Sequence, residues 1–565
     1  MAHKKTDELN ALYKEYWEYQ LETHPTQATY LGDHRYDDRL EDLSEEAYLA
    51  SIEKYQELLE RLSSFGQKSL KGQDRLNYVL FKRLLDLRIE GARFRPALMP
   101  VSQQDGPHLS FPQIVSYHPF KTVGDYENYI KRLEAFPLQI RQAIVCMENG
   151  IGSNLVPARV TIEEVVPQVE TLIVDKPENS PLSEPLRQFP AGIPERERAR
   201  IRSEVEQAIM ESVVPAYQDL LVFIGNRYLN ACREDAGIWA LQDGRDRYDF
   251  AVRLYTSTTM RPEEIHELGL RELDRIHREM GVIQKEVGFQ GDLKAFIDHL
   301  RSDPRFYYSS PSELMEGFRE ILRAMDKKMP LLFGRLPRAA YDLKEIEPYR
   351  AHAAPAAYYY DPPEDLSRPG YFYVNTYRLD SRPKYTMEAL AYHEAVPGHH
   401  LQIAIAHELD ALPDFRQHEG FTVFVEGWGL YAEGLPVEVG FYHDPYSRFG
   451  RLTFDAWRAG RLVVDTGIHA LRWDRERAIA FLKEKTALSE HDIVSEVDRY
   501  IAWPGQALAY KIGELRIREL RREAEEAMGT RFDIRAFHDM FLQNGALPLD
   551  VLEAEVKAWI AGKTP

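Results

Sequence analysis

Two short stretches of the sequence carry the residue types of a hydrolytic metal site. The first is YHEAVPGHHLQ, residues 392–402, and the second is FVEGWGLYAE, residues 424–433. Together they hold the imidazole and carboxylate groups from which catalytic zinc sites draw three ligands, with a fourth position left for water. Hydrolysis by such a water also needs a nearby base that accepts its proton. The two stretches therefore predict a zinc-dependent hydrolase with one zinc ion per chain.

The order of these groups assigns a role to each. His393, one histidine of the pair His399 and His400, and Glu426 supply three metal ligands. Glu394 directly follows the first histidine and is expected to accept the proton of the attacking water. Water is then the nucleophile, and the reaction is the hydrolysis of a peptide or amide bond.

The spacing of the histidines differs from the familiar His-Glu-x-x-His helix, in which ligands four residues apart share one face. On an unbroken helix, His399 and His400 would lie roughly 9 to 10 Å beyond His393 along the axis. Pro397 removes an intrahelical hydrogen bond, and Gly398 tolerates unusual backbone angles. We therefore expect a kink or bulge that brings one histidine back beside His393. We favour His399 and retain His400 as the alternative.

Polar residues further along the chain are candidates for supporting this site. Glu433 lies two turns after Glu426 on the same helix face, where it either orients a ligand or stands at a solvated helix end. Arg461 and Asp465 lie four residues apart on a predicted helix. As a pair they would orient a ligand histidine, bind a substrate carboxylate or form a structural salt bridge.

The segment WPGQALAYK, residues 503–511, predicts the start of another helix. Gln506 and Tyr510 lie four residues apart and share one face of it. Both are candidates for contact with substrate, and a buried core tyrosine is the alternative for Tyr510. Lys511 is expected at the surface. By contrast, the aromatic and β-branched run from Tyr248 to Thr259 predicts a turn or a short extended segment.

Three motifs give the chain its resemblance to a known family: HEAVPGHHLQ, EGWGLYAE and WPGQALAYKIG. With these motifs the chain resembles the bacterial domain-of-unknown-function family eight-eight-five over most of its length. That family is grouped with the gluzincin (thermolysin-clan) metallopeptidases, beside angiotensin-converting enzyme, thimet oligopeptidase and carboxypeptidase Taq. The resemblance implies a zinc metallopeptidase that cleaves short peptides.

The resemblance also implies a fold and further site residues. The fold is mostly α-helical and two-lobed around a deep cleft, with a small β-sheet beside the zinc helix. Tyr510 is implied to stabilise the oxyanion. The extended segment from Tyr371 to Thr376 matches a strand that borders the substrate, so Tyr373 and Asn375 are candidates for substrate binding. The alternative is a strand of a purely structural sheet.

Length and composition set the remaining expectations. The 565 residues predict two lobes, an N-terminal helical lobe (1–250) and a C-terminal catalytic lobe (251–565). The net charge of −19 argues against nucleic acid as a partner. Two cysteines give no disulfide framework, and neither a signal-like N-terminus nor a long uninterrupted apolar run is present. We expect a cytoplasmic protein with no membrane partner; the sequence predicts no oligomeric state.

Two other functions fit the same residues. The zinc and Glu394 would also serve a metal-dependent hydrolase of a non-peptide amide or ester. Alternatively, the chain is a non-catalytic helical binding protein with structural zinc. Structural zinc sites usually have four protein ligands, often cysteines, which disfavours this reading.

Overall fold

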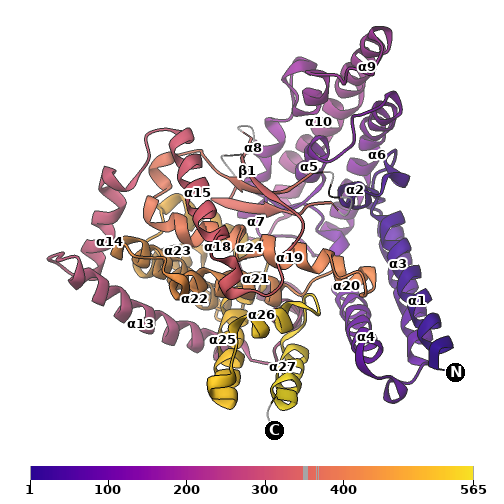
Figure 1. The fold of residues 1–565 in the computed structure, drawn as a ribbon. Helices are drawn as coiled ribbons and strands as arrows, with labels where there is room; N and C mark the ends of the chain where they lie inside the picture. The colour runs from indigo at the N-terminus through magenta and orange to yellow at the C-terminus, as the bar shows by residue number, and fades with distance from the viewer. Residues whose placement is uncertain (1, 348–350, 352–353, 364–365, 367, 564–565) are drawn as a thin grey trace. The chain divides into compact units, whose positions relative to one another are not determined.

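The described chain forms two compact units, in a computed structural model that describes residues 2–347, 351, 354–363, 366 and 368–563 (Figure 1). The first unit comprises Met1–Ala236, Ala240–Gly244 and Pro413–Phe415; the second comprises Gly237–Trp239, Arg245–Leu412 and Arg416–Pro565. The chain therefore crosses between the units more than once. The predicted boundary at residue 250 falls inside the second unit, within helix α12 (Gly244–Thr256).

The first unit is built from helices. Its longest helix, α6 (Val123–Gly152), begins at a capping box in which Thr122 and Asp125 satisfy each other's backbone N–H groups. One face of α6 packs into a large apolar core with α9 and α10. The helices of this region are α1 (Ala2–Thr23), α2 (Pro25–Leu31), α3 (Glu45–Ser63), α4 (Gly72–Ala92), α5 (Pro107–Ser110), α6, α7 (Arg159–Glu163), α8 (Val165–Glu170), α9 (Glu195–Ala208), α10 (Val214–Phe223) and α11 (Leu229–Ala231).

The helical run from Glu195 to Ala231 passes Pro215 without a break. A π-helical stretch, η7 (Ile209–Val213), ends just before this proline, and its wider turn accommodates a residue that has no N–H to donate. By length and composition this run is also apolar enough to cross a membrane, but half of its most apolar window is buried inside the protein. A core helix passes the same test, so this is weak evidence for a membrane span.

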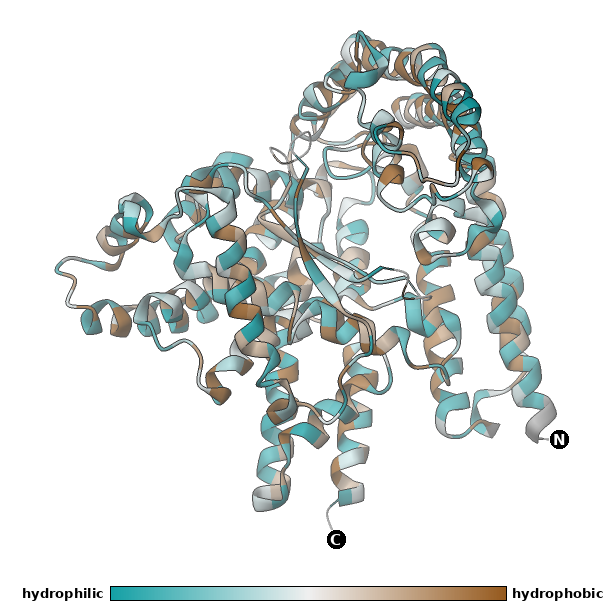
Figure 2. Cartoon of the chain, turned by 45° about the horizontal axis from the view of Figure 1, so that its top comes forward, coloured by the Kyte–Doolittle hydropathy of each residue, from teal (hydrophilic) through white to brown (hydrophobic). Residues whose placement is uncertain are grey.

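Helices also dominate the second unit, which carries the predicted site. In this unit α13 packs extensively against α22, and α21 against α25. Figure 2 shows hydrophobic and hydrophilic residues alternating along the helices of the chain, as expected for helices with one buried face. The helices are α12, α13 (Pro262–Glu286), α14 (Leu293–Ser302), α15 (Pro311–Asp326), α16 (Met329–Leu332), α18 (Met387–Glu394), α19 (His399–His407), α20 (Asp414–His418), α21 (Thr422–Gly434), α22 (Pro445–His469), α23 (Arg475–Lys485), α24 (Glu490–Ala502), α25 (Ala509–Met528), α26 (Ile534–Leu542) and α27 (Leu549–Lys563).

Two glycines set the closeness of the α21–α25 crossing. A Cβ atom on Gly427 would lie 2.6 Å from the Cα atom of Gly513, and a Cβ atom on Gly513 would lie 2.1 Å from the carbonyl oxygen of Val423. No side chain fits between the two helices at this point. Backbone therefore packs directly on backbone, which fixes α21 against α25.

A three-stranded sheet accompanies these helices. Its strands are β1 (Tyr341–Glu345), β2 (Ala357–Tyr360) and β3 (Gly370–Val374), in the order β1-β3-β2. β3 pairs parallel to β1 and antiparallel to β2, and α18 packs against β2. The prediction of a mostly α-helical fold with a small sheet is confirmed.

Two local predictions are wrong. The run from Tyr248 to Thr256 is helical and belongs to α12. The Tyr248 side chain is buried, and its hydroxyl donates a hydrogen bond to Asp465. This tertiary contact outweighs the preference of these residues for extended structure. Lys511 has no exposed surface; its ammonium group lies 2.6 Å from Asp455 and 2.9 Å from Glu514, inside a buried ionic cluster.

We expect Gly427→Ala to lower the melting temperature, because its methyl group would force α21 and α25 apart. Overpacking of this kind costs about 1 to 3 kcal/mol. The matched control is Gly281→Ala in α13, where an added Cβ meets nothing within 4 Å and should be neutral or slightly stabilising. Circular dichroism melts of the three proteins measure both effects. Equal melting temperatures for Gly427→Ala and the wild type would contradict the crossing described here.

Candidate metal centre

A break between two helices brings the histidines together. α18 ends at Glu394 and α19 begins at His399, and between them the Val396–Pro397 peptide bond is cis. The carbonyl oxygen of Pro397 accepts a hydrogen bond from the Trp428 indole at 2.9 Å, which ties this link to α21. The expected kink is thus a complete interruption of the helix.

Gly398 makes the tight return possible. A Cβ atom at this position would lie 1.9 Å from the carbonyl oxygen of His393. No side chain fits there, so only glycine lets the chain fold back onto the end of α18. The first residue of the new helix, His399, is then carried alongside His393.

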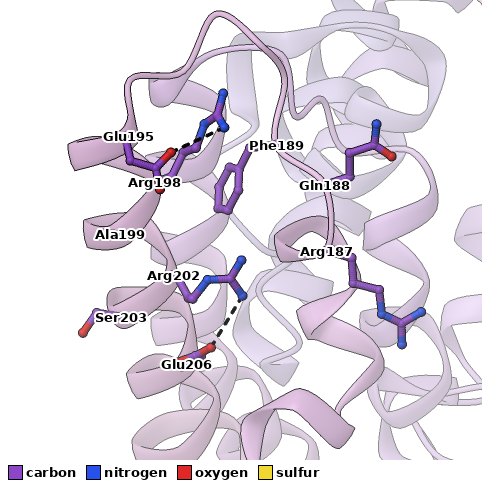
Figure 3. Close-up of a pocket in the computed structure, with 9 residues that line it drawn as sticks. All are labelled: Arg187, Gln188, Phe189, Glu195, Arg198, Ala199, Arg202, Ser203 and Glu206. Carbon is purple, nitrogen blue, oxygen red and sulfur yellow. Dashed lines mark ion pairs between the residues drawn. The ribbon is translucent and has the colours of Figure 1, made fainter.

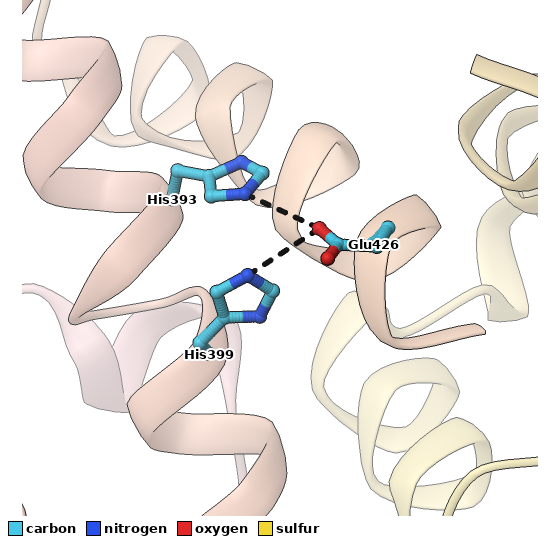
Figure 4. Close-up of side chains that lie close together, drawn as sticks. All are labelled: His393, His399 and Glu426. Atoms are coloured by element: carbon cyan, nitrogen blue, oxygen red, sulfur yellow. Dashed lines mark ion pairs between the residues drawn. The ribbon is translucent and has the colours of Figure 1, made fainter. Parts of the chain in front are cut away.

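Three side chains converge at this point, as Figure 4 shows. Nε2 of His393 lies 3.6 Å from Oε2 of Glu426, and Nε2 of His399 lies 3.5 Å from the same oxygen. One ligand-type atom from each of the three residues lies within 4.8 Å of the others. In the part of the chain that the structure describes, this is the group of His, Cys, Asp or Glu residues suited to holding a metal ion.

The spacing of these atoms fits a zinc ion better than direct hydrogen bonds. Distances of 3.5 and 3.6 Å are too long for good hydrogen bonds, and Oε2 of Glu426 is buried with no hydrogen-bond partner. Ligands that lie about 2.0 to 2.2 Å from a tetrahedral zinc ion are separated from one another by about 3.4 Å. The donor set of two imidazoles and one carboxylate is also one that zinc accepts.

The electrostatics of the three groups favour a cation. Burial would raise the pKa of Glu426, but His393 and His399 hold it well below its usual range. Burial would likewise lower the pKa of His393, yet the carboxylates of Glu426 and Glu433 raise it to about 9. The centre therefore attracts positive charge, and a metal ion would compete with protons for it.

The other ring nitrogen of His393 is fixed by Glu433. Nδ1 lies 2.9 Å from Oε1 of this carboxylate, and Nη2 of Arg458 lies 3.4 Å from the same oxygen. Glu433 is buried, so the solvated helix end is excluded. A carboxylate that accepts the Nδ1 proton turns Nε2 toward Glu426, which is the arrangement found behind many metal-bound histidines.

His400 points away from this centre. Its Nδ1 atom lies 2.7 Å from the Tyr359 hydroxyl, and its ring lies against Tyr341. Burial lowers its pKa to about 4. His400 therefore packs against the sheet, whereas His399 lies beside His393.

Glu394 and Tyr510 also lie near the centre. Glu394 is largely buried and forms no hydrogen bond or ion pair with another residue that the structure describes, so its carboxylate is unengaged. The Tyr510 ring lies parallel to the His393 ring at 6.3 Å. Burial and the charge of Glu426 raise the pKa of Tyr510, so its hydroxyl keeps its proton at neutral pH.

The predicted substrate contacts of β3 are wrong. β3 is the central strand, so β1 and β2 already occupy both of its edges. Asn375 is fully buried, and its amide donates to the carbonyl oxygens of Ala351, Ala354 and Pro355. Tyr373 is buried against Tyr358. Both predicted residues are structural, because the strand pairs on both sides.

Arg461 and Asp465 do not pair with each other. Asp465 accepts a hydrogen bond from the Tyr248 hydroxyl at 2.5 Å and from the Gly505 N–H at 3.1 Å, and it contacts none of the three converging residues. Its predicted role behind a ligand histidine is therefore wrong. It instead holds Gly505, whose positive φ of 84° starts the turn that leads to Gln506 and Tyr510.

Arg461 lies on the Tyr510 side of the centre. Its guanidinium carbon lies 4.2 Å from the centre of the Tyr510 ring, and its nitrogens pair with Glu496 and Tyr500. Gln506 accepts a hydrogen bond from Arg499 at 2.6 Å. The helix face predicted to carry Gln506 and Tyr510 is thus replaced by a 3₁₀ turn, η14 (Gln506–Leu508), followed by α25.

Arg458 is a residue of this centre that the sequence did not indicate, whereas Gly427 and Gly429 beside Glu426 indicated a close approach. Arg458 was an unassigned charge on a long helix, and its approach to Glu433 depends on how α22 packs on α21. Gly429 lies under His393, because a Cβ atom there would lie 2.7 Å from Cε1 of the imidazole. The glycine spacing around Glu426 was the available signal for this contact.

A pocket of about 580 Å³ in the first unit carries no comparable chemistry (Figure 3). Its arginines are matched by carboxylates: Arg198 lies 3.6 Å from Glu195, and Arg202 lies 3.9 Å from Glu206. The pocket is lined by Arg187, Gln188, Phe189, Glu195, Arg198, Ala199, Arg202, Ser203 and Glu206.

We expect His399→Ala to lose bound zinc and His400→Ala to retain it. The two histidines are neighbours in sequence, but only His399 faces Glu426. Metal content per chain, measured by mass spectrometry of the purified proteins, separates them. Zinc lost from His400→Ala and kept by His399→Ala would reverse the assignment.

Asp465 gives a prediction for the pH dependence of stability. Burial raises its pKa in the folded chain to about 7, against an ordinary value of about 4 for an unfolded Asp. Between these values the folded chain binds a proton that the unfolded chain lacks, so this group lowers stability as pH rises from about 4 to about 7. Above that range its effect is constant. Between pH 5 and 7.5 the melting temperature of Asp465→Asn should therefore fall by less than that of the wild type. Equal falls in the two proteins would contradict the raised pKa of Asp465.

Comparisons with other proteins agree with this fold. Residues 25–556 match the model of a family described as "Bacterial protein of unknown function (DUF885)". Among curated proteins, none matches the chain. The crystal structure of a protein from Colwellia psychrerythraea, described as a "putative lipoprotein", is 29% identical, covers 99% of this chain and 100% of its own, and has a TM-score of 0.92.

A second solved structure shows the fold at lower identity. It is described as a "putative lipoprotein of unknown function" from Shewanella oneidensis, is 19% identical, and covers 96% of this chain and 98% of its own with a TM-score of 0.71. Since the family model matches nearly the whole chain, the protein belongs to the bacterial family of unknown function DUF885.

Proposed function

We propose that this protein is a zinc-dependent peptidase that hydrolyses short peptides with an activated water. The observation that carries the proposal is the convergence of His393, His399 and Glu426, with an unengaged carboxylate, Glu394, beside them. Three ligands leave one coordination position for water or substrate, which distinguishes catalytic from structural zinc. The proposal includes a relationship to the gluzincin metallopeptidases.

The residues around the metal would divide the work of hydrolysis. A bound zinc ion supplies Lewis acidity and a water of lowered pKa. Glu394 would take a proton from the attacking water at its carboxylate. The new C–O bond forms at the scissile carbonyl, the C–N bond breaks, and Glu394 returns the proton to the leaving amine. Glu433 would keep the His393 ring in one orientation through Nδ1.

Tyr510 would stabilise the developing negative charge on the carbonyl oxygen. Its hydroxyl stays protonated at neutral pH, because burial and the charge of Glu426 raise its pKa. A protonated phenol next to the centre is a donor that strengthens as the oxyanion forms. The Tyr510 ring lies 6.3 Å from the His393 ring, and this proximity to the candidate metal centre supports the role.

Several parts of the function stay predictions. They are the restriction to short peptides by a deep cleft, the absence of membrane and nucleic-acid partners, and the cytoplasmic location. The word lipoprotein belongs to the two similar structures. A non-peptide amide or ester substrate is the alternative for the same chemistry, and a structural zinc is the non-catalytic one.

We expect Glu394→Gln to bind about one zinc ion per chain and to lose most of its peptide hydrolysis. Glutamine keeps the shape of the side chain but cannot accept the proton of water, and general-base catalysis contributes about 10²- to 10⁴-fold. Metal content and the digestion of a mixed short-peptide library test both parts together. His393→Ala is the contrasting variant and should lose the metal. Full turnover by Glu394→Gln would contradict the assignment of Glu394 as the general base.

A further inference from the structure

We infer that the arginines next to Tyr510 form a subsite for the free C-terminal carboxylate of the substrate, so that the enzyme removes residues from peptide C-termini. The inference rests on the proposed function and specifies its substrate. The subsite comprises Arg458 and Arg461 of α22 and Arg499 of α24. Arg461 lies against the Tyr510 ring, and Arg458 reaches Glu433, the carboxylate that holds Nδ1 of His393.

Arg461 is held rigidly beside the candidate metal centre. Its guanidinium carbon lies 4.2 Å from the centre of the Tyr510 ring and 4.2 Å from that of Trp457, so the planar group is stacked against two aromatic rings. The Tyr510 ring in turn lies parallel to the His393 ring. Both this cation and the candidate metal ligand His393 are therefore neighbours of the same aromatic ring.

The guanidinium groups have donors that the protein does not use. Nε and Nη2 of Arg461 pair with Tyr500 and Glu496, but Nη1 is buried without a hydrogen-bond partner. Nε and Nη1 of Arg458 are buried and unpartnered as well. Leaving a buried charged donor unpaired costs free energy, so these donors indicate an anionic ligand that pairs with them.

The ion pairs of these arginines also favour an anionic ligand. Arg458 pairs with Glu433, while Arg461 and Arg499 share the single carboxylate of Glu496. The three arginines thus have two carboxylates as ion-pair partners, and Arg461 and Arg499 divide one of them. The side chains of Arg499 and Glu496 are each 12% exposed, so the network extends to solvent. A carboxylate of the substrate would give these arginines a further anionic partner.

The distance of these arginines from the scissile bond indicates which end of the peptide they would bind. The scissile carbonyl would lie beside His393, and the substrate carboxylate would lie at the arginines near Tyr510. One or two extended residues, at about 3.5 Å per residue, span the distance between the two. The free carboxylate then belongs to the leaving amine side. Cleavage of the C–N bond would release a C-terminal amino acid or dipeptide, and the proton that Glu394 returns would complete its amino group.

The test compares one pentapeptide with its C-terminal amide, each with a free or an acetylated N-terminus. For the wild-type zinc enzyme we expect kcat/KM to be about 10- to 100-fold higher for the acid than for the amide, as loss of a charge-assisted pair predicts. Acetylation should have no effect, and mass spectrometry should show loss of residues from the C-terminus. Equal rates for acid and amide would overturn the subsite while leaving the peptidase intact.

Arg461→Met tests the residue directly. Glu496 still pairs with Arg499 in this variant, so no carboxylate is stranded. We expect the acid-to-amide ratio to fall toward one, and Arg461→Lys, which keeps the charge, to restore part of it. Arg275→Met is the matched control, because it removes a comparable pair with Asp455 of α22 and leaves all three arginines of the subsite in place, so its ratio should equal that of the wild type. An unchanged ratio in Arg461→Met would refute the inference.

Binding separates this inference from the proposed function. Calorimetry with Glu394→Gln measures the affinity for the acid and the amide peptide without turnover. Tighter binding of the acid supports the subsite, even if the wild type cleaves no peptide. Acid-selective binding without any cleavage would contradict the proposed peptidase activity but not the subsite. Equal affinities, or no binding of either peptide, would overturn the subsite.

Discussion

Close contact between backbones is the constraint on which the centre depends. α21 has no side chain at Gly427, where it crosses α25, and none at Gly429, where the His393 ring lies over it. The turn at Gly398 also requires a residue without a side chain, because a Cβ atom there would collide with the end of α18. Three points without side chains thus bring Glu426 within 3.6 Å of two imidazoles that lie on separate helices.

The close packing also explains why polar groups around the centre are so well buried. Glu433 and Arg458 are almost completely enclosed, and they fix the outer nitrogen of His393 from behind. Buried charges are stable only in such pairs or beside a metal ion. Several buried atoms here have no hydrogen-bond partner: Oε2 of Glu426 at the candidate metal centre, Oε2 of Glu433 behind it, and donors of Arg458 and Arg461 beside Tyr510.

The position of Tyr510 depends on contacts far from the metal ligands. Asp465 accepts hydrogen bonds from Tyr248 and Gly505, and this fixes the turn from which α25 starts. The Tyr510 ring then lies near both the His393 ring and the Arg461 guanidinium. The start of α25 thus links the proposed oxyanion donor to the proposed carboxylate subsite, because α22 supplies both Asp465, which holds this start, and Arg461, which lies against Tyr510.

The sequence by itself determined the helical class and indicated His393, Glu426 and one of the pair His399 and His400 as converging residues, because they are recognisable by type and local order. It left the choice within that pair open, and the structure places His399 beside Glu426. It also indicated the break at Pro397 and Gly398, since both effects are local. It did not determine that β3 is the central strand, which removed Tyr373 and Asn375 from the candidates, nor that Asp465 pairs with Tyr248 and Arg461 with Glu496. Only the tertiary structure decided these points, because strand order and the partners of buried charges depend on contacts between residues distant in sequence.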